Sequence, residues 1–382
     1  MIEKKDGLYD NRGIRVEDYN DGYYHVFQDC FEHPSYQIYL AYSRRGPGKT
    51  TSALLGSLLR GLKVLYLKRE VQDVAAITNS TSALNMSPWS SVNKLTGSNF
   101  RAIRIKGQKN IAEVVNCDPD GNPIDGAEPI GWIFALCNAG KIKGFDISHL
   151  VDIIILDEFV PSSGTRVLQA EGIFLLDLIA TVNRDRVDKG FNPTKIFLFS
   201  NCDSLGCPIT RELNLLDELY ELNATGNKFR ANEERSIFIR HILSNEFKNN
   251  TNILLFKPMI GTDWYERNVI GNFTEDFSSI DSGRSLKNYK CVSKLIYKQR
   301  VVYILNRESD GSYYITYNYT LRVSKDIPIY NLDIESHVNR FFYSPVYMSL
   351  LGKMIYELVS FSNYSLYDLI RNYTTIYNKK MY

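Results

Sequence analysis

Apolar residues recur in two alternating patterns along the first two thirds of this 382-residue chain. Several short and nearly continuous apolar runs are typical of buried strands: residues 37–42, 63–68, 152–156, 195–199 and 236–243. Segments with helical periodicity lie between them, including residues 51–62 and 173–182. Because strands and helices alternate, the pattern predicts an α/β fold with a doubly wound parallel sheet.

Further strand-like runs interrupt this alternation at residues 100–106, 111–116 and 130–136. The turn signal Asp118-Pro119-Asp120-Gly121 separates the second run from the third. We therefore expect short antiparallel strands, inserted before the apolar strand that begins near residue 152.

The composition changes after about residue 244. Residues 1–244 carry the α/β pattern, and residues 245–284 are predicted to be a linker or small subdomain because they lack clear periodicity. The remaining part is residues 285–382. Its strand-like runs are residues 291–297, 301–306 and 313–319, and the helical segments that follow them are residues 348–359 and 367–371. This order predicts a small α+β domain at the C-terminal end.

Overall composition narrows the class of protein. A hydrophobic content of 44% is ordinary for a globular protein, and the net charge of +2 is too small to identify a nucleic-acid binder by itself. No apolar run is long enough to span a membrane, and the first residues lack the apolar core of a signal peptide. We expect a protein that stays in the cytoplasm where it is made, with its six cysteines reduced and not spaced as zinc ligands.

The segment Ser43-Arg44-Arg45-Gly46-Pro47-Gly48-Lys49-Thr50 joins an apolar strand to a helical pattern. This context is typical of the phosphate-binding loop of P-loop NTPases, in which backbone N–H groups point at the phosphates. Lys49 would reach the β- and γ-phosphates, and the Thr50 hydroxyl would occupy one Mg²⁺ position. Ser43 departs from the usual pattern, which begins with glycine. The alternative is a chance Gly-Lys-Thr in an ordinary turn.

A second motif is the apolar strand that ends in Asp157 and Glu158. In P-loop enzymes the first acid holds Mg²⁺ through water and the second polarises the attacking water. The pair therefore favours an active ATP hydrolase, although a buried strand that runs into a solvated acidic turn would look the same. The strand at residues 195–199 ends in Ser200-Asn201, which is either a γ-phosphate sensor or plain turn chemistry.

With these motifs in place, the chain resembles the DNA-packaging ATPases of small protein-primed tailed phages, the phi29-like group. Four blocks carry the resemblance: Arg45-Gly46-Pro47-Gly48-Lys49-Thr50, Asp157-Glu158-Phe159, the helix at 175–182 with its tail Arg184-Asp185-Arg186, and Leu198-Phe199-Ser200-Asn201. Their order and spacing match over residues 36–245, and the C-terminal part is more weakly similar.

The resemblance implies a terminase-like P-loop ATPase of the ASCE class that binds ATP and Mg²⁺ and drives double-stranded DNA into a viral procapsid. It implies a homo-oligomeric ring, a pentamer, docked on the portal of the procapsid in the host cytoplasm, with no membrane partner. Some members of the group carry a structural RNA in the ring, which is a further candidate partner.

Residue by residue, the resemblance places the nucleotide on Arg45, Gly46, Pro47, Gly48, Lys49, Thr50, Thr51 and Asn201, and Mg²⁺ on Thr50 and Asp157. Glu158 and Lys49 would act within their own subunit. Arg184 would act on a neighbouring subunit, as would Lys143 or, in its place, Lys141. The alternative for Arg184 is a charge that complements the helix dipole.

The C-terminal domain of this family looks like a degenerate nuclease of the RNase H type. Nuclease chemistry needs clustered carboxylates for two metals, yet the run at 291–297 carries no acid, and Asp310 and Asp326 lie in turn-like sequence. We therefore expect no nuclease activity and a role in contacting DNA or the portal. The basic residues that could make this contact, or could form an ordinary solvated edge, are Lys287, Lys290, Lys294, Lys298 and Arg300. Two other functions stay open, a complete terminase with nuclease activity and a nucleotide-binding assembly protein that does not hydrolyse.

Overall fold

The computed structural model describes residues 4–5, 7–8, 22–79, 87–141, 147–161, 167–243, 246–248 and 253–377. The chain forms two compact units, residues 1–274 and residues 275–382. The segment expected to be a linker or small subdomain, residues 245–284, is therefore divided between the two units. Near the N-terminus, β1 (Lys4–Lys5) and β2 (Gly7–Leu8) form a small antiparallel pair.

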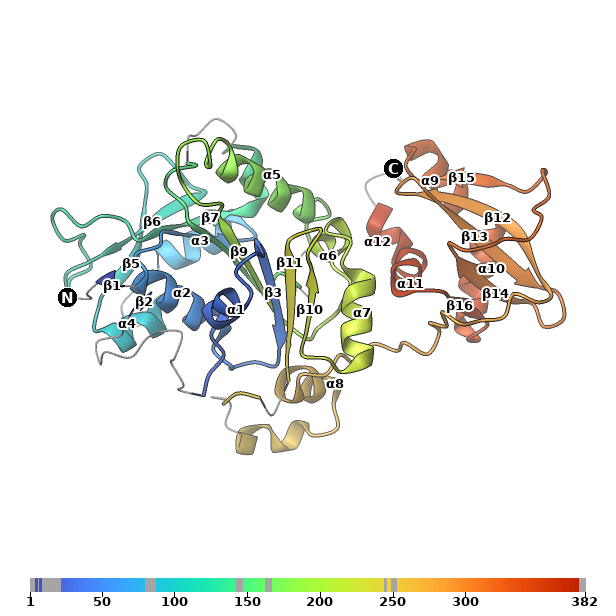
Figure 1. The fold of residues 1–382 in the computed structure, drawn as a ribbon, viewed down its shortest axis with the longest axis horizontal. Helices are drawn as coiled ribbons and strands as arrows, with labels where there is room; N and C mark the ends of the chain where they lie inside the picture. The colour runs from blue at the N-terminus through green and yellow to red at the C-terminus, as the bar shows by residue number, and fades with distance from the viewer. Residues whose placement is uncertain are drawn as a thin grey trace. The chain divides into compact units, whose positions relative to one another are not determined.

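The first unit is built on a nine-stranded sheet with the order β10-β11-β3-β9-β8-β4-β7-β6-β5 (Figure 1). Its strands are β3 (Ile38–Ser43), β4 (Val64–Lys68), β5 (Phe100–Arg104), β6 (Ile111–Asn116), β7 (Gly131–Ala135), β8 (Ile153–Asp157), β9 (Lys195–Asn201), β10 (Phe229–Asn232) and β11 (Ile237–Ile242). Neighbours from β11 to β7 run parallel, whereas β10, β6 and β5 pair antiparallel. The predicted α/β class is confirmed as a mixed α/β unit with a large, mostly parallel sheet.

The position of β7 corrects one sequence-based prediction. The run near residue 131 was expected to be antiparallel, like β5 and β6, but β7 pairs parallel with β4 while remaining antiparallel to β6. All five residues of β7 are buried, as suits a strand inside the sheet rather than at its edge. Gly131 permits the close approach, because a Cβ at this residue would lie 2.3 Å from the Val64 carbonyl oxygen.

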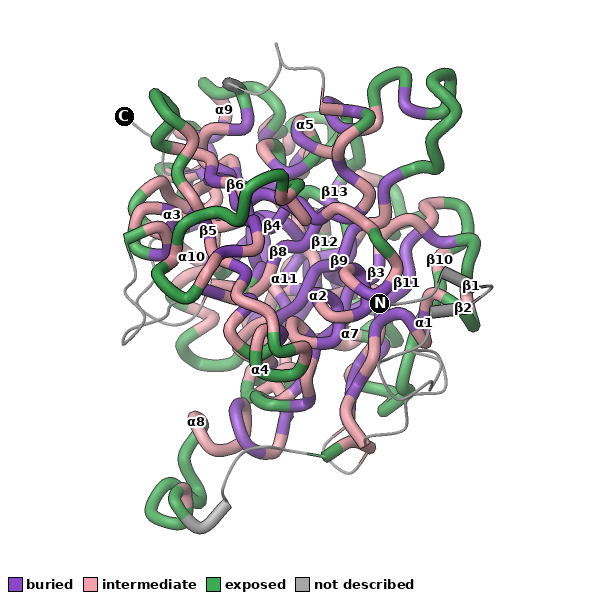
Figure 2. Tube along the Cα trace, turned by 90° about the vertical axis from the view of Figure 1, so that its left-hand side faces the viewer, coloured by how far each residue is buried: buried purple, intermediate pink, exposed green. Residues whose placement is uncertain are grey.

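Helices connect these strands and bury the apolar faces of the sheet. They are α1 (Val26–Glu32), α2 (Lys49–Leu59), α3 (Val71–Thr78), α4 (Ser90–Thr96), η1 (Leu136–Lys141), α5 (Glu171–Asn183), α6 (Pro208–Glu212), α7 (Leu216–Thr225), η2 (Ile253–Met259), α8 (Asp263–Tyr265) and η3 (Glu266–Ile270). The central strands are buried almost throughout, as the tube in Figure 2 shows for β4, β8 and β9. Their side chains form one core with those of α2, including Leu54, Ile155 and Phe197.

The second unit contains a five-stranded sheet with the order β15-β12-β13-β14-β16. Its elements are β12 (Tyr289–Tyr297), β13 (Arg300–Arg307), β14 (Ser312–Thr316), β15 (Ile329–Asn331), α9 (Glu335–Phe342), α10 (Pro345–Ile355), β16 (Val359–Phe361), α11 (Tyr364–Arg371) and α12 (Tyr373–Tyr377). The first three strands are antiparallel, while β15 lies parallel to β12 and β16 lies parallel to β14.

The helix predicted at residues 348–359 also differs from the structure, because α10 ends at Ile355 and residue 359 begins a strand. Glu357 has a left-handed backbone, with φ of 57°, and Leu358 N–H donates to the Lys353 carbonyl at 3.0 Å. This arrangement closes the last turn of a helix, so the apolar residues after it extend into β16. Across the described residues, every helix is too short or too polar to cross a bilayer.

Candidate nucleotide site

The loop between β3 and α2, residues 44–48, forms the floor of a cavity at the carboxyl edge of the sheet. Gly46 and Gly48 have positive φ angles of 87° and 100°, which glycine adopts without steric cost, and Gly48 caps α2. The cavity has a volume of about 270 Å³ and is lined by Arg45, Gly46, Pro47, Gly48, Lys49, Thr50, Thr51, Asp157, Glu158, Ser200 and Asn201. The three motifs singled out in the sequence therefore meet in one pocket.

Lys49 is the first residue of α2, and its side chain is almost fully buried at the base of this pocket. The Lys49 ammonium donates to the Ser43 hydroxyl and to the Arg44 carbonyl at 3.4 Å. Burial lowers the pKa of Lys49 to about 8, although the nearby Asp157 carboxylate opposes this shift. Ser43, the departure from the usual loop pattern, thus supplies a hydrogen-bond acceptor for the lysine.

Asp157 ends β8 and contacts side chains of α2 and β4. Its Oδ2 accepts a hydrogen bond from Thr50 Oγ1 at 2.5 Å and one from the Tyr66 hydroxyl at 3.4 Å. Its Oδ1 accepts from the backbone N–H of Glu158 at 3.0 Å. A hydroxyl and a carboxylate held together in this way are the oxygen donors that Mg²⁺ prefers in proteins.

Glu158 is exposed in the pocket and has a left-handed backbone, with φ of 57°. Arg69, which follows β4, donates to the carbonyls of Glu158 at 2.6 Å and of Phe159 at 2.8 Å. Arg69 Nε also lies 2.7 Å from Glu171 Oε1 at the start of α5, and both side chains are buried. Arg69 therefore ties the turn that carries Glu158 to α5, a role that no sequence motif indicated.

At the end of β9, Ser200 and Asn201 line the same pocket. The Ser200 side chain is buried, and among the described residues its hydroxyl has no hydrogen-bond partner. An unsatisfied hydroxyl at a pocket wall is available to a polar ligand, because a buried donor gains free energy when it is paired.

Arg184 lies far from the pocket of its own chain. It is exposed and directly follows α5, whose 13 residues correspond to about 20 Å of helix. The first residue of α5, Glu171, is the end that contacts Arg69 near Glu158. At the other end, Arg186 is buried and forms an ion pair with Asp152 at 2.6 Å, just before β8 begins.

Lys143 and Lys141 are the other basic residues expected to act between subunits. Lys143 lies outside the described residues, and for Lys141 only the backbone is described, as the last residue of η1.

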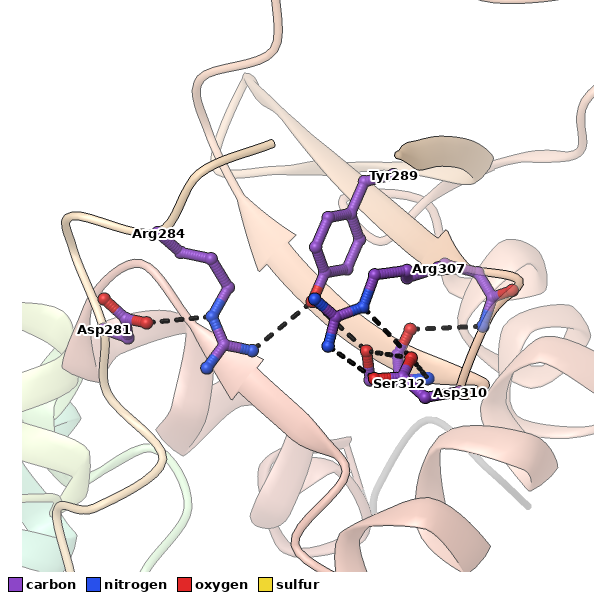
Figure 3. Close-up of polar contacts among 7 residues, drawn as sticks. Asp281, Arg284, Tyr289, Arg307, Asp310 and Ser312 are labelled. Atoms are coloured by element: carbon purple, nitrogen blue, oxygen red, sulfur yellow. Dashed lines mark hydrogen bonds and ion pairs between the residues drawn. The ribbon is translucent and has the colours of Figure 1, made fainter. Parts of the chain in front are cut away.

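Of the two acids considered for nuclease chemistry, Asp310 contacts residues of its own turn. Asp310 lies in the β13–β14 turn, where it forms an ion pair with Arg307 and accepts from the Ser312 hydroxyl at 2.8 Å (Figure 3). The Arg307 and Ser312 hydrogen bonds hold the pKa of Asp310 well below its usual range. Within the described part of the chain, His, Cys, Asp and Glu side chains form no cluster of three suited to a metal ion.

No protein-family model matches this chain, and no curated protein matches it by sequence. Its fold is similar to that of the Phi-28 gp11 DNA packaging motor, with a TM-score of 0.58 and 16% identity over 94% of this chain and 96% of that one. It is also similar to the bacteriophage Phi-29 viral genome packaging motor assembly, with a TM-score of 0.59 and 16% identity over 95% of this chain and 100% of that one. The fold of this chain thus also occurs in phage DNA-packaging motors.

Proposed function

We propose that this protein is an ATP-driven translocase that packages double-stranded viral DNA into a procapsid through the portal. The observation that carries the proposal is the single pocket that joins Lys49 and Thr50 to Asp157 and Glu158. Its setting in a fold shared with two phage packaging motors favours DNA over other substrates of ATP-driven machines.

Each pocket residue has a specific task in this proposal. Backbone N–H groups of the β3–α2 loop and the Lys49 ammonium hold the phosphates of ATP. The Thr50 hydroxyl and the Asp157 carboxylate hold Mg²⁺, which when bound offsets the negative charge of the phosphate oxygens. Glu158 polarises the attacking water, and Asn201 contacts the γ-phosphate.

The test is hydrolysis of ATP and packaging of DNA by the full chain. Lys49→Ala is expected to abolish both activities, because it removes the charge at the phosphates. Glu158→Gln is expected to retain ATP binding and stall hydrolysis, because only the charge that polarises water is lost. Asp188→Asn, a change of an exposed acid after α5, serves as the control and should behave as wild type. Wild-type turnover in Lys49→Ala would contradict the proposal.

The second unit is proposed to contact the DNA backbone or the portal and to lack nuclease activity, as expected for a degenerate RNase H-like domain. Residues 275–382 contain 14 Lys and Arg against 10 Asp and Glu. Several of these cations lie over tyrosine rings, including Lys294 over Tyr303 at 5.6 Å and Arg300 over Tyr317 at 3.8 Å. Nicking of supercoiled DNA with Mg²⁺ or Mn²⁺, removed by Asp310→Ala or Asp326→Ala, would instead support a complete terminase.

The ring is proposed to be homo-oligomeric, with Arg184 of each subunit reaching the pocket of the next.

Motion along any genome sequence requires contacts with phosphates rather than with bases. DNA affinity should therefore fall steeply with salt and vary little with sequence. ATP binding without phosphate release, both with and without DNA, would instead support a nucleotide-binding assembly protein that does not hydrolyse.

A further inference from the structure

The segment that contains α8 and η3, which was predicted to be a linker or small subdomain, packs against the nucleotide pocket. Asn268, in η3, is almost fully buried. Its Oδ1 accepts a hydrogen bond from Arg45 Nε at 2.7 Å, and its backbone carbonyl accepts from Arg45 N–H at 3.0 Å. Its Nδ2 donates to the Trp264 carbonyl at 3.1 Å, which fixes the amide plane.

A second contact joins the same segment to the strand that ends in the pocket. Arg267 Nη1 lies 3.7 Å from Asp203 Oδ1, two residues beyond Asn201, and both side chains are mostly buried. Residues 267 and 268 thus contact the β3–α2 loop on one side and the end of β9 on the other. The helical turn at these residues is a π-helix, a form that is rare and is often found at functional sites.

Gly271 ends this turn and permits its close approach to the loop. Its φ is 89°, and a Cβ at this position would lie 3.1 Å from the backbone nitrogen of Arg44. Any other residue would be strained here and would crowd the loop. The contact between η3 and the loop is therefore built into the backbone as well as the side chains.

We infer that Asn268 is a positioning residue of the nucleotide site, which holds the Arg45 guanidinium in place for the phosphates of the nucleotide. An arginine side chain has many rotamers, and fixing it before the ligand arrives lowers the entropy lost on binding. Asn268 accepts two hydrogen bonds from Arg45, which fix its backbone and the Nε edge of its guanidinium, while Arg45 lines the pocket. This inference rests on the proposed function, since it assigns a role at the same site.

A double-mutant cycle on the full chain tests the inference through the KM for ATP. Asn268→Ala should raise KM about tenfold, because the Arg45 side chain would then have to be ordered when ATP binds. In an Arg45→Ala background the same change should alter KM by less than about twofold, because the residue that Asn268 positions is gone. Asn272→Ala, an exposed change in the same segment, is the matched control and should leave KM unchanged.

Equal effects of Asn268→Ala in both backgrounds would overturn the inference, because the asparagine would then act on the fold alone. Thermal unfolding of each variant separates loss of structure from loss of binding. If Asn268→Ala does not fold, Arg45→Lys tests the contact from the other side, since lysine keeps the charge but has no Nε–H for Asn268. Lys49→Ala distinguishes the two proposals: normal turnover in that variant contradicts the ATPase itself, whereas normal KM in Asn268→Ala contradicts only the positioning role.

Discussion

Thr50 Oγ1 donates a hydrogen bond to Asp157 Oδ2 at 2.5 Å, which links the start of α2 to the end of β8. The two residues are 107 positions apart in the chain, and parallel strand pairing from β3 through β9 to β8 brings them together. A carboxylate and a hydroxyl held at this spacing form the part of the site that suits Mg²⁺. A substitution of Thr50 alone therefore tests the predicted Mg²⁺ position.

Thr50→Val should raise the Mg²⁺ concentration needed for half-maximal ATP hydrolysis by about tenfold, since one oxygen ligand is lost while the side-chain shape is retained. Thr50→Ser is the matched control, because it keeps the hydroxyl, and it should stay close to wild type. Hydrolysis measured at increasing Mg²⁺ and constant ATP checks this prediction. An unchanged Mg²⁺ dependence in Thr50→Val would remove Thr50 from the metal site.

The parts of the site predicted from sequence are those with local signals. The β3–α2 loop and the Asp157-Glu158 pair each lie within a few residues of a strand that periodicity identifies. The contacts of Arg69 with Glu158 and of Arg45 with Asn268 join residues 89 and 223 positions apart. Such contacts are set by tertiary packing, so no local pattern could indicate them.

The same distinction applies to the fold. The long strands of the first sheet were predicted close to their observed bounds, because continuous apolar runs are strong signals. The pairing of β7 depended on a close approach at Gly131, which the apolar pattern does not encode. In the second unit, β15 and β16 have three residues each and are too short for periodicity to detect.

Arg69 provides a second prediction, which separates stability from hydrolysis. Arg69→Met should destabilise the protein by about 3–5 kcal/mol, because it leaves Glu171 buried without its ion-pair partner. The double variant Arg69→Met, Glu171→Leu should recover most of this stability, since it removes the buried charge. Hydrolysis should remain low in both, because neither holds the Glu158 and Phe159 carbonyls. Chemical denaturation measures the stability of both variants, and ATP turnover measures their hydrolysis. Recovery of stability and hydrolysis together in the double variant would contradict the role of Arg69 in positioning Glu158.

The pH dependence of Arg69→Met follows from Glu171. Burial raises the pKa of Glu171 to about 7, although Arg69 opposes the shift. A folded-state pKa above the unfolded value of about 4.3 means that stability falls as pH rises from about 4.3 to 7. Without Arg69 the pKa of Glu171 should rise further, so the variant should lose more stability at pH 8 than at pH 5. A loss that is equal at both values would argue that Glu171 does not titrate.

Lys49 should give opposite pH dependences for nucleotide binding and for stability. Its pKa of about 8 means that the ammonium loses its charge as pH rises from 7 to 9. ADP affinity should fall about tenfold over that range, because the neutral amine no longer attracts phosphate. The free energy of unfolding should rise with pH between about 8 and 10.4, since the unfolded chain then binds more protons.

Isothermal titration and thermal melts across this pH range check both trends. Lys49→Met is the matched control, because it retains a long side chain without the charge. In that variant both dependences should become flatter. A wild-type ADP affinity that stays constant from pH 7 to 9 would contradict the assignment of Lys49 to the phosphates.

Arg184 gives the prediction that depends on assembly. Arg184 follows a helix of about 20 Å whose opposite end lies beside the turn of Glu158, so it is too far away to serve its own pocket. If it serves a neighbour, Arg184→Ala should fold and bind ATP but hydrolyse poorly, because an arginine stabilises the charge that develops in phosphoryl transfer. Val187→Ala, an exposed change three residues further along, is the control for general disturbance of this surface.

Mixing Arg184→Ala subunits with Glu158→Gln subunits decides between action on a neighbour and action in the same chain. Each pure assembly lacks one essential group and should be nearly inactive. In mixed assemblies, an Arg184→Ala subunit keeps its own Lys49 and Glu158 and can receive Arg184 from a Glu158→Gln neighbour. Such composite sites are complete, so hydrolysis should reappear and pass through a maximum at intermediate mixing ratios. If mixed assemblies form and no ratio restores hydrolysis, Arg184 acts only on its own subunit or only on its structure, and the proposed site between subunits is wrong.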